Sequence, residues 1–187
     1  MIIVVGFLVA VLTVPMFGGN LWDVAEIKIR DGHLIVVSFV IQTLVISFVA
    51  SRVPEAVSQT VHLYSYLLAL MFVFLNRRLT GLTVVALGAA ANTVAIAANG
   101  GVMPASDLAE RIAGIDPGAG FANSSVVADA KFLPLGDVFA VPHGWPFANV
   151  FSIGDVLLVI GAGIVLHHAC GSRLARSSPR HPQLTAR

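Results

Sequence analysis

Seven polar residues between positions 99 and 155 have side chains of the types used in acid–base or metal chemistry: Asn99, Asn123, Asp129, Lys131, Asp137, His143 and Asp155. Two or three carboxylates near a histidine can bind a metal ion or transfer protons. These residues are widely spaced in the sequence, so only the tertiary fold could bring them together. Hydrogen bonds that hold an irregular loop in place would explain them equally well. Both interpretations stay open for the candidate polar site, which consists of Asn99, Asn123, Asp137, His143 and Asp155.

A helix start is predicted at the end of this stretch. The sequence Ser152-Ile153-Gly154-Asp155 has the S-x-x-D form of a capping box, in which Ser152 caps the helix and Asp155 accepts a hydrogen bond from the Ser152 amide. The Asp155 carboxylate would also lie at the positive end of the helix dipole. The pattern therefore favours a structural role for Asp155 over a catalytic one.

Known catalytic and cofactor motifs are absent from the sequence. It has no H-E-x-x-H, no G-x-S-x-G and no P-loop, so no cofactor is predicted. His167 and His168 are adjacent, and adjacent side chains on a helix do not converge on one ligand. No metal site is predicted, and whether the protein is an enzyme stays uncertain, with the sequence favouring a non-catalytic role.

Composition predicts an all-α integral membrane protein. Hydrophobic residues make up 57% of the 187 residues and charged residues only 11%, with a mean hydropathy of +0.87. Soluble domains carry about 25% charged residues. Five apolar segments are long enough to be considered transmembrane helices, at residues 1–17, 33–50, 55–76, 79–98 and 152–168. They form a single domain over residues 1–170, with a folded extracytoplasmic insert at 99–151 between the fourth and fifth segments.

The distribution of basic residues predicts an orientation in the bacterial cytoplasmic membrane. Five spans place the two termini on opposite sides, and 8 of the 11 Lys and Arg residues fall on the side of the C-terminus. The positive-inside rule then predicts a multi-pass protein with its N-terminus outside and its C-terminus in the cytoplasm. The tail at 171–187 is basic and is predicted to be disordered and attracted to anionic lipid.

Three residues within the predicted spans are polar or small enough to specify helix packing: Gln42, Gly88 and Asn92. Gly88 and Asn92 belong to a stripe of small or polar residues on one face of segment 79–98, together with Gly81, Ala95 and Asn99. Gly154 and Gly161 form a shorter stripe in the last segment. Such stripes let helices approach closely. Plain packing is favoured, and a lined cavity is the alternative.

The insert at 99–151 is too long and too aromatic for a simple linker. It contains six of the fifteen aromatic residues and five of the nine prolines. Structureless loops beyond about 12–15 residues are uncommon. Short helices are predicted over 107–114, where Asp107 and Glu110 fit a capping box, and over 123–131.

Four motifs resemble the signature of a bacterial family. They are Asn99-Gly100-Gly101-Val102-Met103-Pro104, Gly120-Phe121-Ala122-Asn123-Ser124, Leu135-Gly136-Asp137-Val138-Phe139 and Val150-Phe151-Ser152-Ile153-Gly154-Asp155. The family consists of small integral membrane proteins known only as a domain of unknown function. The resemblance covers about residues 1–168. It implies a membrane location and a shared fold, and it assigns no catalytic residue.

Two classes of function remain. The first is a non-catalytic accessory or binding protein that uses the 99–151 insert to contact a protein partner or lipid. The second is a membrane-embedded enzyme that acts on a lipid or envelope substrate at the outer face. Expected partners are the lipid bilayer, anionic lipid at the basic tail and a protein, but no nucleic acid.

Overall fold

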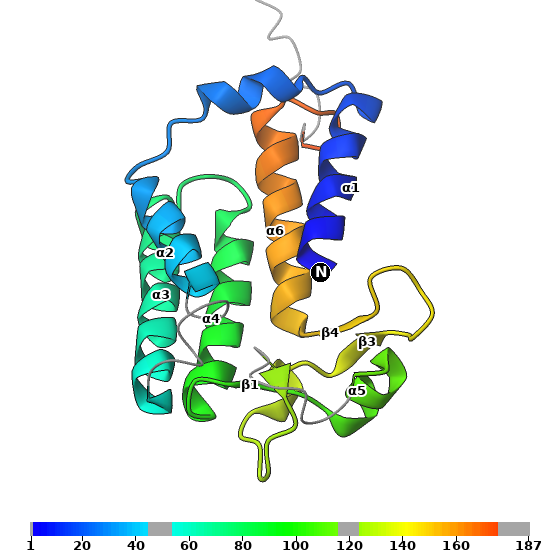
Figure 1. The fold of residues 1–187 in the computed structure, drawn as a ribbon. Coiled ribbons are helices and arrows are strands. Elements are labelled where there is room, and N and C mark those ends of the chain that lie inside the picture. The colour runs from blue at the N-terminus through cyan, green and yellow to red at the C-terminus, as the bar shows by residue number, and fades with distance from the viewer. Residues whose placement is uncertain (1, 45–53, 116–123, 176–187) are drawn as a thin grey trace, which may run out of the picture.

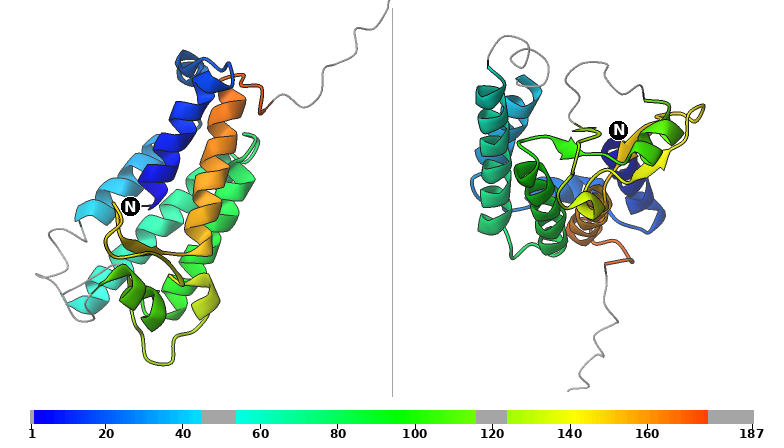
Figure 2. Two further views of the ribbon diagram at one scale, coloured as in Figure 1. Left: turned by 90° about the vertical axis from the view of Figure 1, so that its right-hand side faces the viewer. Right: turned by 90° about the horizontal axis from the view of Figure 1, so that it is seen from below.

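Five helices build most of this protein, whose computed structural model describes residues 2–44, 54–115 and 124–175 (Figure 1). The helices are α1 (Ile2–Met16), α2 (His33–Leu44), α3 (Glu55–Leu75), α4 (Leu82–Ala98) and α6 (Ile153–Ala169). They pack in the spatial order α2, α3, α4, α6, α1, and the most extensive pair is α4 with α6. The first helix therefore lies beside the last, as Figures 1 and 2 both show.

Local sequence explains where most of these helices begin and end. Pro54 immediately precedes α3, where its missing N–H costs no helical hydrogen bond. Gly81 precedes α4 with φ of +94°, a conformation that favours glycine. Ser152 begins α6 with the complete capping box that the S-x-x-D pattern predicts. Helix α2 is described only to Leu44, so the predicted end of that segment at Ala50 lies outside the described residues.

Two connectors close the end of the bundle where α6 stops. The 3-10 helix η1 (Leu21–Glu26) crosses from α1 towards α2, and the α3–α4 turn lies on the same side (Figure 1). The Asn76 side chain fixes the segment that follows η1 to the end of α3. Its Oδ1 accepts from the Arg30 amide at 2.8 Å, and its Nδ2 donates to the Arg30 carbonyl at 2.9 Å.

The opposite end of the bundle carries the folded segment at 99–151. Strand β1 (Met103–Pro104) pairs in parallel with β2 (Ser124–Ser125), and β3 (Phe139–Val141) pairs antiparallel with β4 (Asn149–Phe151). Helix α5 (Asp107–Ala113) packs on β3 and β4, and the short 3-10 helix η3 (Leu133–Leu135) contacts α4 and α6. Ala109 and Ala113 of α5 form a small core with Val150 of β4.

The predictions for this segment were partly right. A helix is present near 107–114, but its N-cap is Ser106, whose Oγ accepts from the Ala109 amide, so the capping box assigned to Asp107 and Glu110 was wrong. The helix predicted over 123–131 is absent from its described part. Ser124 and Ser125 pair with β1 instead, because their backbone hydrogen-bonding groups serve a partner distant in sequence. Asp129 has φ of +52°, which no right-handed helix contains.

The prediction of five transmembrane helices was wrong. In the described part of the chain, no helix combines the length and apolar character needed to cross a bilayer. Helices α4 and α6 have 17 residues each and α1 has 15, so each spans about 25 Å or less against a hydrocarbon core of about 30 Å. Helix α3 has 21 residues, but polar side chains such as Ser58, Thr60 and Ser65 interrupt it. This finding contradicts the predicted transmembrane helices. It therefore also contradicts the predicted location in the cytoplasmic membrane and the orientation of the termini that was derived from it.

The high mean hydropathy has a visible structural origin. Apolar side chains line the outside of the bundle as well as its core: Val4, Leu8 and Leu12 of α1 are each more than half exposed. These residues recur every four positions and therefore share one face of the helix. Hydropathy summed over the sequence cannot separate such an exterior from a buried core.

Candidate functional site

Asp155 lies in a hydrogen-bonded cluster where α6 begins against α4. One carboxylate oxygen accepts from Asn92 Nδ2 at 2.8 Å, and the other accepts from the Ser152 amide at 3.2 Å. Ser152 Oγ donates to Asn92 Oδ1 at 2.9 Å and accepts from the Asp155 amide at 3.0 Å. Ser152 and Asn92 are buried. Each oxygen of Asp155 thus already has a donor within the protein, as expected of a side chain that joins two helices.

Two reciprocal glycine contacts bring α4 and α6 together around this cluster. A Cβ atom on Gly88 would lie 2.6 Å from the Gly154 carbonyl oxygen, and one on Gly154 would lie 2.8 Å from the Gly88 carbonyl oxygen. Gly81 and Gly161 make a similar contact seven residues, or about two helical turns, away on each helix. A Cβ on Gly154 would also lie 1.9 Å from Asn92 Oδ1. The small residues on both helices are therefore used for close backbone approach, which positions Asn92 against Asp155.

Asp137 is the candidate residue with the most perturbed acidity. It is buried at 7% exposure and its backbone links two loops, with its amide donating to the Pro104 carbonyl and its carbonyl accepting from the Ser106 amide. Burial is the largest cause that raises the pKa of Asp137, and the Asp155 and Glu110 carboxylates act in the same direction, while a hydrogen bond with the Ser124 side chain lowers it. Together these effects raise the pKa of Asp137 from 3.8 to about 6. Asp137 is therefore easier to protonate than an ordinary aspartate.

Glu110 is a buried acid that the sequence analysis had assigned only to a cap. It lies on α5 at 3% exposure, and its Oε2 has no hydrogen-bond partner among the described residues. Burial, and next the Asp107 carboxylate, raise the Glu110 pKa. No local sequence pattern marks Glu110 as buried, because its burial beside Ala109 and Ala113 depends on how α5 packs on β3 and β4. Asp137 and Glu110 are thus two carboxyl groups of raised pKa, and they lie close enough for Glu110 to raise the pKa of Asp137.

Asn99 holds the segment in place rather than facing a ligand. Its Nδ2 donates to the Lys131 carbonyl at 2.7 Å and its Oδ1 accepts from the Lys131 amide at 2.9 Å. This is the same two-bond arrangement that Asn76 makes with Arg30 at the other end of the bundle. In each case the asparagine caps the C-terminus of a helix and its side chain pairs with the backbone of a distant residue. The sequence analysis did not recognise Asn76, because no local pattern reveals its partner.

The remaining candidates lie apart from this cluster. His143 is exposed in the β3–β4 loop, next to Gly114 at the end of α5, and its amide donates to the Ile112 carbonyl. Asn123 lies outside the described residues. Gln42 is half-buried in an open apolar pocket between α2 and α3, whereas Asn92 is bonded to α6, so the two do not form one site.

The structure thus brings together Asp155, Asn92 and Ser152, and places the Asp137 carboxylate near Asp155. It gathers no group of three or more His, Cys, Asp or Glu side chains suited to hold a metal ion within residues 2–44, 54–115 and 124–175. His167, which the sequence analysis considered only as half of an adjacent pair, is buried and bridges elements: Nδ1 lies 2.8 Å from Ser172 Oγ and Nε2 lies 3.2 Å from Thr13 Oγ1. These arrangements connect helices and loops.

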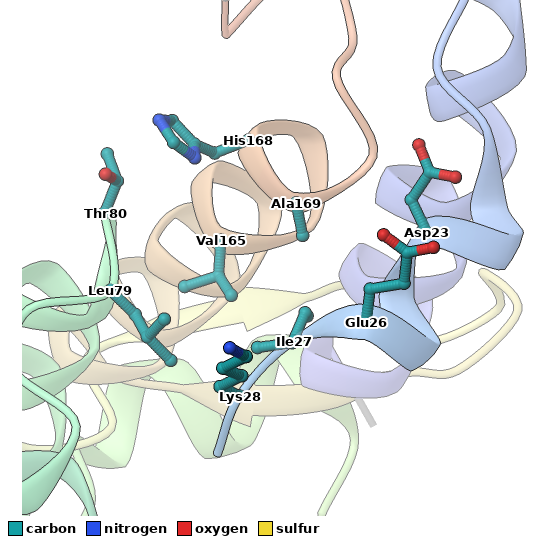
Figure 3. Close-up of a pocket in the computed structure, with 9 residues that line it drawn as sticks. All are labelled: Asp23, Glu26, Ile27, Lys28, Leu79, Thr80, Val165, His168 and Ala169. Atoms are coloured by element: carbon teal, nitrogen blue, oxygen red, sulfur yellow. The ribbon is translucent and has the colours of Figure 1, made fainter.

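A second feature is an open pocket at the other end of the bundle (Figure 3). It has a volume of about 380 Å³ and lies between η1, the α3–α4 turn and the last turn of α6. Charged or polar side chains from all three elements line it: Asp23, Glu26, Lys28, Thr80 and His168. None of these residues was a site candidate in the sequence analysis, because they are spread over three separate parts of the chain.

Comparison with known proteins identifies the family. Residues 26–167 match a family of unknown function (DUF5317), and the chain belongs to that family. It is also similar to an uncharacterized protein of Thermotoga maritima, with 27% identity over 158 residues that cover 84% of this chain and 86% of the relative. No solved structure matches the chain. The match confirms the expected membership of a family of unknown function, but it confirms neither the four motifs nor a membrane location, and it brings no function.

Proposed function

We propose that this protein is a non-catalytic binding protein whose 99–151 segment docks a protein partner. The observation that carries the proposal is the exposure of two aromatic side chains in the loop between β3 and β4: Trp145 is 70% exposed and Phe147 is 56% exposed. Tryptophan is highly buried on average, and aromatic residues are enriched among the side chains that dominate the energetics of protein–protein interfaces.

The loop that carries these aromatics is held in a defined shape. Strands β3 and β4 pair on either side of it, and the Phe139 and Phe151 rings stack with centroids 5.5 Å apart. Within the loop, the Trp145 amide donates to the Pro142 carbonyl, and the His143 amide donates to the Ile112 carbonyl on α5. A preorganised loop loses little conformational entropy when it binds, so exposed aromatics on it favour recognition.

The hydrogen bonds of two candidate site residues support a structural role. The Asp155 and Asn99 side chains bond to other groups of the protein, as described above. The raised pKa of Asp137 is the observation that favours an enzyme, since a general base works best with a pKa near the working pH. Asp137 lies at 7% exposure, and it lines neither the pocket beside η1 nor the pocket between α2 and α3. The binding function is therefore the better supported one.

The test is site-specific photo-crosslinking in cells of the native host. A photoreactive residue replaces Trp145, and the matched control replaces Leu174, which is 61% exposed and follows α6, next to Arg173, whose amide donates to the Phe17 carbonyl. We expect one discrete protein adduct from position 145 and none of the same mass from position 174. Phe147→Ala should reduce the yield of that adduct, because it removes the neighbouring aromatic contact.

Complementation of a strain that lacks the gene separates binding from catalysis. Trp145→Ala should lose function at normal abundance, whereas Asp137→Asn and His143→Asn should retain it. Loss of function in abundant Asp137→Asn protein, with Trp145→Ala active, would refute the binding proposal and favour an enzyme.

A further inference from the structure

The pocket at the η1 end of the bundle is independent of the 99–151 segment and has a fixed frame. The Asn20 amide donates to the Cys170 carbonyl at 3.0 Å, which ties the start of η1 to the end of α6. Asn20 Oδ1 accepts from the Trp22 amide, and Asn20 Nδ2 donates to Asp23 Oδ1 at 2.8 Å. The Asn76–Arg30 hydrogen bonds secure the other end of the connector. The walls of the pocket are therefore held at both ends.

Charges of opposite sign lie on different sides of this pocket. Figure 3 shows the carboxylates of Asp23 and Glu26 near each other on one side of the pocket and the Lys28 ammonium apart from them. The apolar side chains of Ile27, Leu79 and Val165 lie around Lys28 in this view. A ligand that satisfies the whole pocket needs a cationic group, an apolar middle and an anionic group.

The charged groups of the pocket are not already paired with each other. Among the described residues, the salt bridge that forms is Arg111 with Asp107, which lies on α5 and not here. The Lys28 ammonium is therefore available to an anionic group, and the Glu26 carboxylate to a cationic one. The pocket volume of about 380 Å³ falls at the small end of the range of ligand sites, roughly 300–1,000 Å³.

We propose that this pocket binds a small zwitterion whose ammonium and carboxylate groups are separated by a short apolar chain. Asp23 and Glu26 receive the ammonium group, Lys28 receives the carboxylate, and the chain lies on Ile27, Leu79 and Val165. Thr80 and His168 supply further hydrogen-bonding groups on the side opposite the acids. Neither the family assignment nor the proposed partner surface assigns a role to these residues.

Binding is measured by isothermal titration calorimetry with 4-aminobutanoate and 6-aminohexanoate as zwitterionic probes. Butylamine and butanoate carry the two charges separately. We expect one zwitterion to bind more tightly than both single-charge probes by about two- to fivefold, the range for a solvent-exposed ion pair. Lys28→Met should reduce zwitterion affinity by the same factor and leave butylamine unchanged. Glu26→Gln should reduce the affinity for the zwitterion and for butylamine, and leave butanoate unchanged.

Two controls remove charges close by but outside the pocket lining. Arg30→Met keeps the backbone that Asn76 holds, and Asp31→Asn replaces a residue at φ of +51° with one that tolerates that conformation. Both should bind the probes like the unaltered protein, and thermal unfolding verifies that all variants fold. The proposal is overturned if neither zwitterion binds at concentrations on the order of 10 mM. It is also overturned if the zwitterions bind no better than their single-charge halves, or if the control variants lose as much affinity as Lys28→Met.

Discussion

Replacing Gly154 with alanine tests the close approach of α4 and α6 directly. The new methyl group would lie 1.9 Å from Asn92 Oδ1, 2.6 Å from Asn92 Cγ and 2.8 Å from the Gly88 carbonyl oxygen. Real Cβ atoms do not approach other atoms this closely, so Asn92 must move and the two helix backbones must separate slightly. The perturbation is one methyl group, placed where the sequence pattern predicts only a small residue.

The expected loss follows from the bonds of Asn92. Moving its side chain breaks a hydrogen bond to the charged Asp155, worth about 1.5–3 kcal/mol, and one with neutral Ser152, worth about 1 kcal/mol. Alanine regains at most about 1 kcal/mol through its higher helix propensity. The net effect is a loss of about 1.5–3 kcal/mol, or roughly 3–12 °C in the unfolding midpoint for a chain of this size.

Gly163→Ala provides the matched control on the same helix. Its Cβ would meet only Ala10 Cβ, at an ordinary contact distance of 3.7 Å, so helix propensity should raise stability by up to about 1 kcal/mol. Urea denaturation followed by circular dichroism measures both variants. Opposite signs are expected, and the Gly154→Ala effect should shrink in an Asn92→Ala background. If Gly154→Ala is as stable as Gly163→Ala, the described seam between α4 and α6 is wrong.

Three further predictions concern the polar residues. Folding raises the pKa of Asp137 from 3.8 to about 6, so its contribution to stability is greatest below pH 3.8 and falls by about 3 kcal/mol as the pH rises through 6. Asp137→Asn should abolish that component, which is measured as the difference between variant and unaltered protein in urea denaturation from pH 4 to 8. Asp155→Asn keeps one acceptor but loses the charge and should cost about 1–2 kcal/mol by thermal unfolding, while NMR titration should show a lower Asp137 pKa; an unchanged Asp137 pKa would contradict their coupling. Asn99→Ala should remove the bonds to Lys131 and accelerate hydrogen exchange of the Lys131 amide by about tenfold or more, with Asn76→Ala as the control that affects Arg30 instead.

Sequence by itself was enough for the features whose causes are local. The Ser152-x-x-Asp155 pattern predicts a helix start because both partners of the cap lie within one helical turn, and α6 begins there with that cap. Pro54 marks the start of α3 for a similarly local reason. The predicted segments coincide broadly with α1, α3, α4 and α6, since apolar runs bounded by glycine, proline and asparagine favour helices of that extent.

Tertiary structure decided every feature whose partner is distant in the chain. Ser124 and Ser125 pair with Met103 and Pro104, so the predicted helix over 123–131 gives way to a strand and turns. Asn92 meets Asp155 across 63 positions, and Asn99 meets Lys131 across 32. Local propensity is too weak to anticipate such partners, because one backbone pairing or buried hydrogen bond outweighs a preference of a few tenths of a kcal/mol per residue.

The membrane prediction failed for a related reason. Hydropathy measures how apolar a segment is, but a span also requires an unbroken apolar helix of about 20 residues. Helices α1, α4 and α6 have 15 to 17 residues, and α3 has 21 with polar interruptions, because glycines, caps and turns end them where other elements must pack. The starts of α3 and α6 were available locally, whereas the face that each helix turns inward or outward depends on its neighbours in space.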